Sequence, residues 1–518
     1  MTVPNHCFMM RTLRMIVCVA FGAVAAGSAF GFSMWGPAES WQTQDLDYGL
    51  RYLPFFPLQD STVFEVEGPG SLAAHDNELG GTKNFGEGSR LNVPIITYAY
   101  DSTFLTYFGA KGVAAVDSAF TLLNGLPRAS TVNAKISGFI TQGNQQVNYT
   151  AEALRMIDLK STVMWLMMEH MGLIGETHTY DLRERVATGL TGAGPCDFYY
   201  VVLQRNFDPV SYDPSQYVNG TLLTYQIGDL CPAVAVGDAM EEAQQVGAPP
   251  FSCVATREAL QVGGYYLRIT RDDMGGLKYL YRSSRYVNEG LDTNSVAGAS
   301  VGTFNPVSTT ETNVAATTTA FSGLLGGVEK ITFIKTPYDS VLGTSFAPLV
   351  YHYKIPWVTN GVLKTLNVTR TITQPDIIFT AGDLTFPGPA PYQVTLVRSS
   401  PTGTPAGFVA TGFAVSLGTG DPLATPRVIT PQLIVTLNNS GQVYYNQGKP
   451  FADQANAIGL GFIWGSFNGS TNAPVPFPTG ASLDEIEAQV FTAGPETLQN
   501  GIFNPVSLTA TNVSTATQ

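Results

Sequence analysis

The sequence is short of charge, and of positive charge in particular. Only 13% of its 518 residues are charged, with 27 Lys and Arg against 40 Asp and Glu, so the formal net charge is −13 at pH 7. Nucleic acids and anionic lipid surfaces are bound through clusters of basic side chains. An acidic chain with so few lysines and arginines favours neither, and we expect no nucleic-acid partner.

Cysteine is also scarce. The chain has five cysteines, and no two of them form the C-x-x-C pair typical of a zinc knuckle. Two lie in the first 31 residues, which leaves Cys196, Cys231 and Cys253 in the remainder. In an oxidising compartment these three can form one disulfide, and the sequence does not decide which two pair.

The sequence has no long hydrophobic run, and its most apolar stretch is the short one at residues 15–27. Two arginines precede this run, and the small residues Ala29 and Gly31 follow it. A basic start, a short apolar core and a small-x-small exit are typical of a cleaved secretory signal peptide. The run is shorter than the ~20 residues of a membrane-spanning helix. We therefore expect residues 1–31 to be removed and the mature chain to be exported, with no membrane insertion.

Glycine, proline and uncharged polar residues are abundant, with 53 Gly and 32 Pro. The mature chain is longer than one hydrophobic core usually serves. We predict an α+β domain over residues 32–290. Over residues 291–502, short β-branched runs between turn residues predict one or two all-β, sandwich-like domains.

Individual elements follow from the spacing of apolar residues. Helical spacing predicts helices over 110–123 and 151–173. Residues 264–271 and 277–282 are typical of a hairpin whose turn is formed by DDMGG at 272–276. Strands are predicted over 91–100, 196–205, 329–335, 349–355, 363–373, 393–398, 408–415 and 432–437.

One eleven-residue segment occurs twice. FNPVSTTETNV at 304–314 and FNPVSLTATNV at 503–513 are identical at nine of eleven positions. One interpretation is a recurring turn and strand at a domain entry. Another is that the terminal segment, 503–518, adds a strand to a sheet edge of a neighbouring molecule and links subunits head to tail. The assembly residues are then those that open this segment: Phe503, Asn504, Pro505, Val506 and Ser507.

Three segments of the first domain form a recognisable pattern. They are Ile95–Asp101 (IITYAYD), Gly112–Leu123 (GVAAVDSAFTLL) and Asp158–Leu173 (DLKSTVMWLMMEHMGL). The first two resemble the opening strand and first helix of matrixin-type metallopeptidases of the metzincin group, and the third resembles the helix that carries their zinc motif. The resemblance covers roughly residues 90–175 and implies a metallopeptidase-like fold, while the chain as a whole looks like a secreted bacterial protein.

The resemblance does not include the zinc chemistry. The motif His-Glu-x-x-His needs two imidazoles on one helix face and a glutamate that acts as base. Here Trp165 stands at the first ligand position, Leu166 at the position of the base, and Glu169 at the second ligand position. Since tryptophan and leucine neither bind zinc nor transfer protons, the resemblance implies a degenerate fold without catalysis.

A weaker metal candidate follows in the same stretch, where Glu169, His170, Glu176 and His178 lie close together in the sequence. Carboxylate and imidazole groups bind zinc. However, adjacent residues such as Glu169 and His170 point to different sides of a helix. We therefore predict no metal site and no cofactor.

Other catalytic patterns are incomplete. GTSFA at 343–347 falls one residue short of the G-x-S-x-G nucleophile pattern. GLLGG at 323–327 lacks the Lys-Ser/Thr pair of a phosphate loop. Trp464, flanked by apolar residues, is typical of a β-sheet core rather than of a sugar-stacking surface.

Together these features favour a secreted or cell-surface structural protein over an enzyme. We expect it to form a homo-oligomer or polymer through its β-rich part. The alternative is a non-catalytic pseudo-peptidase or a module that binds a glycan or peptide ligand. An active hydrolase explains the sequence least well, because no complete catalytic constellation is present.

Overall fold

The computed structural model describes residues 32–34, 90–132, 136–174, 180–187, 198–204, 206–229, 237–243, 253–255, 262–292, 294–298, 321–338, 347–381, 431, 433–437, 442–445, 455–457, 463–484 and 486–487. The predicted signal peptide, both copies of the repeated segment and the predicted strands 393–398 and 408–415 lie outside these residues.

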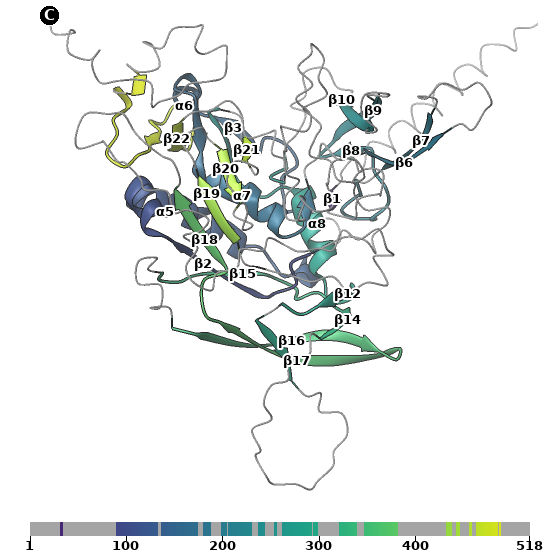
Figure 1. Cartoon of the computed structure of the whole chain (residues 1–518). Helices are drawn as coiled ribbons and strands as arrows, with labels where there is room; N and C mark the ends of the chain where they lie inside the picture. Colours follow the sequence, from purple (N-terminus) through teal and green to yellow (C-terminus); the bar gives the residue numbers. More distant parts are fainter. Residues whose placement is uncertain are drawn as a thin grey trace, which may run out of the picture.

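A six-stranded sheet forms the middle of the molecule (Figure 1). Its order is β15 (Thr332–Lys335), β2 (Ile95–Tyr100), β18 (Ile377–Ala381), β19 (Leu433–Leu437), β20 (Gln442–Tyr445) and β21 (Ala455–Ala457). The first four strands are parallel, and β20 and β21 are antiparallel to their neighbours. Because β2 precedes residue 290 and the other five strands follow it, the expected domain boundary does not separate two sheets.

The first predicted helix is confirmed and is longer than expected. Helix α5 spans Ser102–Asn124, and the carboxylate of Asp101 caps it by accepting a hydrogen bond from the Phe104 amide at 3.0 Å. The helix is kinked at Gly109, which has a φ of +57° and where a Cβ would lie 2.4 Å from the Thr479 hydroxyl. Helix α5 packs against the six-stranded sheet and against helix α7 (Leu159–His170).

The second predicted helix, 151–173, is divided in two. Helix α6 (Tyr149–Ala153) ends before Arg155, whose φ is +54°, and strand β4 (Met156–Asp158) follows. Helix α7 then begins because the Asp158 carboxylate accepts hydrogen bonds from the amide and hydroxyl of Ser161 at 2.8 and 2.6 Å. Strand β4 joins a three-stranded sheet, β23 (Val475–Pro476), β22 (Ile463–Ser466) and β4. Trp464 in β22 is fully buried, which confirms its prediction as a core residue.

The predicted hairpin over 264–282 is wrong. Residues 264–266 form β11 (Gly264–Tyr266), which pairs with β3 (Gln145–Val147), and the next element is helix α8 (Arg271–Tyr281). A capping box between Thr270 and Asp273 starts this helix. At Gly275 a Cβ would lie 2.2 Å from Pro209, so the glycine permits close packing inside a helix rather than a turn.

A second, five-stranded sheet is antiparallel and contains four strands after residue 290 together with β12 (Val287–Gly290), which ends there. Its order is β12, β14 (Ser322–Leu325), β16 (Leu349–Thr359), β17 (Val362–Ile372) and β13 (Ser295–Ala297). The strands predicted after residue 290 thus exist where the structure describes them, but they are shared between this sheet and the six-stranded one. Strands β16 and β17 form a long hairpin, here called the arm, at the bottom of Figure 1. The arm turns at Asn360-Gly361, whose φ values of +50° and +72° suit the Asn-Gly pair that a two-residue hairpin loop favours.

Arg370 of β17 joins the two large sheets. It is fully buried, and its guanidinium donates to Asp292, to Asp376 at 3.0 Å and to the Ile95 carbonyl of β2 at 3.1 Å. The amide and hydroxyl of Thr97, also in β2, donate to the same Asp376 carboxylate. Burial disfavours the charged form of Arg370, but the two carboxylates outweigh it and raise the pKa of the guanidinium above its ordinary value.

The remaining described elements are small. They are the sheet β10 (Gly237–Ala243), β9 (Thr221–Asp229) and β8 (Tyr217–Val218), the pair β6 (Tyr180–Ala187) and β7 (Phe198–Gln204), the pair β1 (Ser33–Met34) and β5 (Leu173–Ile174), and the 3-10 turn η3 (Ala129–Thr131). None of the helices in the described part of the chain is both long and apolar enough to cross a bilayer.

Candidate functional site

The positions that correspond to the zinc motif lie in the hydrophobic core. Trp165 and Leu166 of α7 are both completely buried. They belong to the same core cluster as Phe104 and Phe108 of α5. At these two positions a metallopeptidase would have a zinc ligand and the catalytic base. In this chain both side chains pack in the hydrophobic core.

Of the weaker metal candidates, the structure describes the side chain of His170 alone. The side chain of Glu169, together with Glu176 and His178, lies outside the described residues, and His170 is fully buried at the end of α7. Among the residues with a described position, no group of three or more His, Cys, Asp or Glu side chains is arranged to hold a metal ion.

His170 gives a prediction about pH. Burial lowers the pKa of its imidazole to about 3. A hydrogen bond to the backbone of Pro431 raises the pKa, but burial has the larger effect. In the unfolded chain the pKa is about 6.5, so between these two values the unfolded state binds a proton that the folded state does not. The contribution of His170 to stability is therefore complete above the unfolded pKa and is lost as the pH falls through this window.

Urea unfolding across the same pH range measures this effect in the wild type and in the His170→Met variant. The wild type is expected to lose more stability than the variant as the pH falls. Because the other titrating groups are common to both proteins, parallel stability profiles would contradict the buried, neutral imidazole.

Other residues singled out in the sequence have structural partners. Asp273 accepts hydrogen bonds from the amides of Val254 and Ala255 at 3.0 Å each, in addition to its capping role. Cys253 is buried with its Sγ 3.2 Å from the Asn219 side-chain amide. Cys196, Cys231 and most of the segment 343–347 lie outside the described residues.

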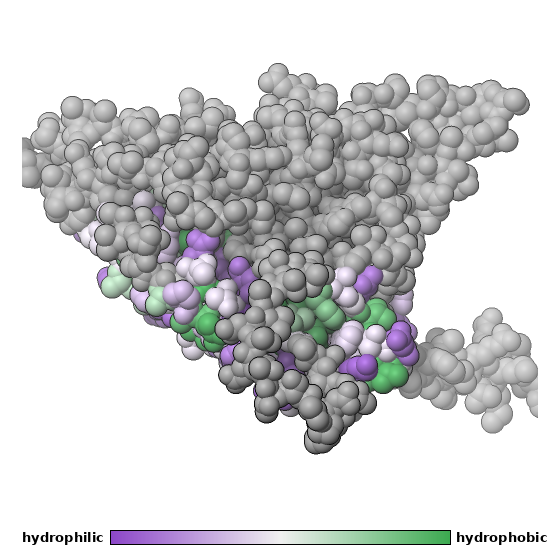
Figure 2. Space-filling view, turned by 60° about the horizontal axis from the view of Figure 1, so that its bottom comes forward, coloured by the Kyte–Doolittle hydropathy of each residue, from purple (hydrophilic) through white to green (hydrophobic). Residues whose placement is uncertain are grey.

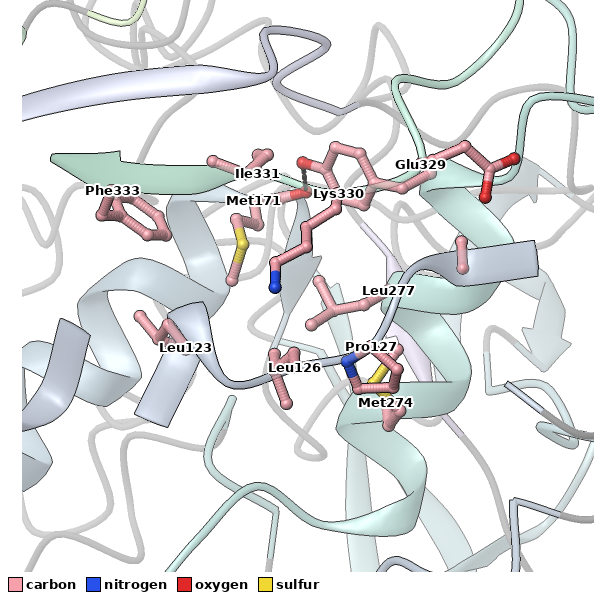
Figure 3. A pocket seen from close by; sticks show the side chains of 12 residues that line it. Leu123, Leu126, Pro127, Met171, Met274, Leu277, Glu329, Lys330, Ile331 and Phe333 are labelled. Atoms are coloured by element: carbon pink, nitrogen blue, oxygen red, sulfur yellow. Dashed lines mark hydrogen bonds between the residues drawn. The ribbon is translucent and has the colours of Figure 1, made fainter. Parts of the chain in front are cut away.

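A small pocket lies where the end of α5, the end of α7, helix α8 and strand β15 meet (Figure 3). It is mainly apolar, and its polar side chains are engaged with backbone groups. Lys330 Nζ donates to the Asn124 carbonyl at 2.6 Å, and the Tyr281 hydroxyl donates to the Met171 carbonyl at 2.6 Å. Ligand sites usually have polar groups that converge on the ligand, and these polar groups already have partners in the protein.

The arm carries an exposed apolar row. Leu324 of β14 lies opposite Val358 of β16, which lies opposite Leu363 of β17. Residues opposite each other in a sheet project from the same face, so the three side chains form one row across three strands, here called the outer row. Leu324 is 43% exposed and Leu363 is 61% exposed. Figure 2, which brings this side of the molecule forward, shows apolar residues among polar ones on the described surface.

The charge of the arm is opposite to that of the protein. Residues 349–372 contain no Asp or Glu, whereas the chain has a net charge of −13. Lys354 and Lys364 of the arm are exposed. An apolar row beside isolated lysines suits a surface that meets an acidic protein partner.

Comparisons of the chain with protein-family models, with curated proteins and with solved structures found no match. The resemblance to metallopeptidases therefore stays a prediction, and the proposals below rest on the surface of the arm.

The sequence contained a signal for two of the three residues of the outer row. A two-residue Asn-Gly loop pairs Thr359 with Val362 and hence Val358 with Leu363. The spacing of apolar residues predicts the two strands but not their pairing, which only the loop indicates. Leu324 was not accessible to such reasoning, because β14 is separated from β16 by residues that carry no pairing signal.

Proposed function

We propose that this protein is a secreted or cell-surface structural protein that self-assembles, and that the arm is one of its contacts between subunits. The observation that supports this most strongly is the outer row. Three apolar side chains lie in register across β14 and the two strands of the arm, and Leu324 and Leu363 among them are exposed to water in the isolated chain. Covering them in a contact removes apolar surface from water, at about 25 cal/mol per Å².

The charge pattern supports a second copy of the same chain as the partner. The arm is positive and the chain is acidic overall, so the arm of one molecule is attracted to the body of another. The predicted export signal and the low charge content agree with assembly outside the cell, where a large part of each surface is covered by neighbours.

The test is the assembly state of the exported protein, measured by size-exclusion chromatography with light scattering. The wild type is expected to form species larger than a monomer. The double variant Leu324→Lys, Leu363→Lys places two charges in the outer row, so its distribution should shift towards monomers. Tyr149→Lys is the matched control, because Tyr149 is 63% exposed on α6, outside the arm.

Two outcomes contradict this proposal. One is a wild-type protein that remains monomeric at every concentration, which would leave the alternative, a non-catalytic pseudo-peptidase or a module that binds a glycan or peptide. The other is a double variant that assembles as well as the control, which would remove the arm from the contact.

A further inference from the structure

One edge of the arm has backbone groups that pair with no strand in the described part of the chain. Strand β13 pairs with β17 at residues 368–370. On either side of it, the Gly298 amide donates to the Asn367 carbonyl and the Thr371 amide donates to the Asn294 carbonyl. Among the described residues, no strand lies beside this edge of β17 from Val362 to Leu366, a stretch here called the open edge.

The direction of the backbone groups on this edge follows from the register. Asn367 and Thr371 bond towards β13, and successive residues of a strand direct their N–H and C=O groups to opposite sides. The odd-numbered residues of β17 therefore face β13, while the even-numbered ones face β16. Beyond the end of β13, Leu363 and Thr365 continue the same row of donors and acceptors.

The other edge of the arm is less suited to accept a strand. There the even-numbered residues of β16 face outward, as shown by the bond from the Gly326 amide to the Pro356 carbonyl. Pro356 has no N–H to donate, and Lys354 stands next along the edge. Proline and lysine are residues that protect sheet edges from strand addition. Neither occupies the outward-facing positions 363 and 365 of β17.

The two copies of the repeated segment differ in a way that indicates which of them can bury a face. They differ at two positions: the first copy has Thr309 and Glu311 where the second has Leu508 and Ala510. After Pro505, the second copy alternates strictly between apolar Val506, Leu508 and Ala510 and polar residues. This is the pattern of a strand with one buried face, whereas the first copy places a threonine and a charge on that face.

The first copy follows closely in the sequence after a residue that bonds to this strand. It begins at Phe304, the sixth residue after Gly298, whose amide donates to the Asn367 carbonyl next to the open edge. The two copies are identical at nine of eleven positions. This closeness in the sequence is our reason for choosing the open edge as the site for the second copy.

We propose that Phe503–Val513 of one molecule adds as a strand to the edge of β17 between Val362 and Leu366 on a second molecule. This inference rests on the proposed self-assembly and names its contact. The added strand bonds to the backbone of Leu363 and Thr365. Its apolar face lies beside Leu363 and extends the outer row by one strand.

The test exchanges the two differences between the copies, in the full exported chain. The variant Leu508→Thr, Ala510→Glu makes the second copy identical to the first. It should require at least about tenfold more protein for half-maximal assembly, equivalent to about 1.4 kcal/mol. The matched control is the reverse exchange, Thr309→Leu, Glu311→Ala, which should assemble at least as well as the wild type. Light scattering measures both, and circular dichroism verifies that each variant is folded.

A second variant tests the edge itself. Thr365→Pro removes one outward-facing N–H of β17 and none of the bonds to β16, because even-numbered residues make those bonds. It should lose assembly to a similar extent while its fold, followed by circular dichroism, is retained.

The outcomes distinguish this inference from the proposed function. If the wild type assembles and the outer-row lysines prevent assembly, while both the copy exchange and Thr365→Pro assemble normally, the arm is a contact but the added strand is wrong. If the wild type is monomeric, the proposed function fails as well.

Discussion

Replacement of Arg370 by methionine is expected to lower the free energy of unfolding by about 3–5 kcal/mol. The guanidinium is fully buried between Asp292 and Asp376, and both carboxylates are themselves fully buried. Without Arg370 the two carboxylates keep their burial but lose their counter-charge. A loss of this size is a large part of the roughly 5–15 kcal/mol that holds a typical domain folded.

Chemical denaturation of Arg370→Met against the wild type measures this loss. Lys364→Met is the control, because Lys364 lies on the same strand but is exposed, and it should change stability by no more than about 0.5 kcal/mol. A loss below about 1 kcal/mol for Arg370→Met would contradict the role of this residue as the link between the two sheets.

The second large effect is expected at Trp165, the residue that the predicted resemblance aligns with a zinc ligand of metallopeptidases. Trp165→Ala removes one of the largest fully buried side chains and leaves a cavity between α7 and its neighbours. Replacement of a buried tryptophan by alanine costs about 3–5 kcal/mol. Thermal unfolding of this variant should therefore show a much lower Tm than the wild type.

Lys160→Ala on the same helix is the comparison for Trp165→Ala, since Lys160 is only partly buried. It should leave Tm almost unchanged. If Trp165→Ala were equally harmless, position 165 would not be a packing position. The interpretation of α7 as a helix whose side chains at 165 and 166 pack in the core would then be wrong.

Periodicity predicted the long elements well and failed where local hydrogen bonds decide. Helix α5 and the strands of the arm follow from patterns of apolar residues, which burial in the core enforces. The DDMGG stretch looked like a turn because Asp and Gly favour turns. The capping box at Thr270 and the tight contact at Gly275 make it part of a helix instead.

Long-range pairing was beyond the sequence patterns. The parallel neighbours of β2 are β15 and β18, which follow it by more than 200 residues. No local signal links such strands, and the change of composition near residue 290 favoured a domain boundary there. In the arm, the Asn-Gly loop carried enough information to align Val358 with Leu363, because a two-residue loop sets the register.

The central claim is that this protein is built to assemble with copies of itself. The most direct measurement is light scattering of purified wild-type residues 32–518 over a range of concentrations, followed by negative-stain microscopy of the largest species. The account predicts a molar mass that rises with concentration above that of one chain, with ordered particles in the images. A molar mass that stays at one chain throughout would contradict it.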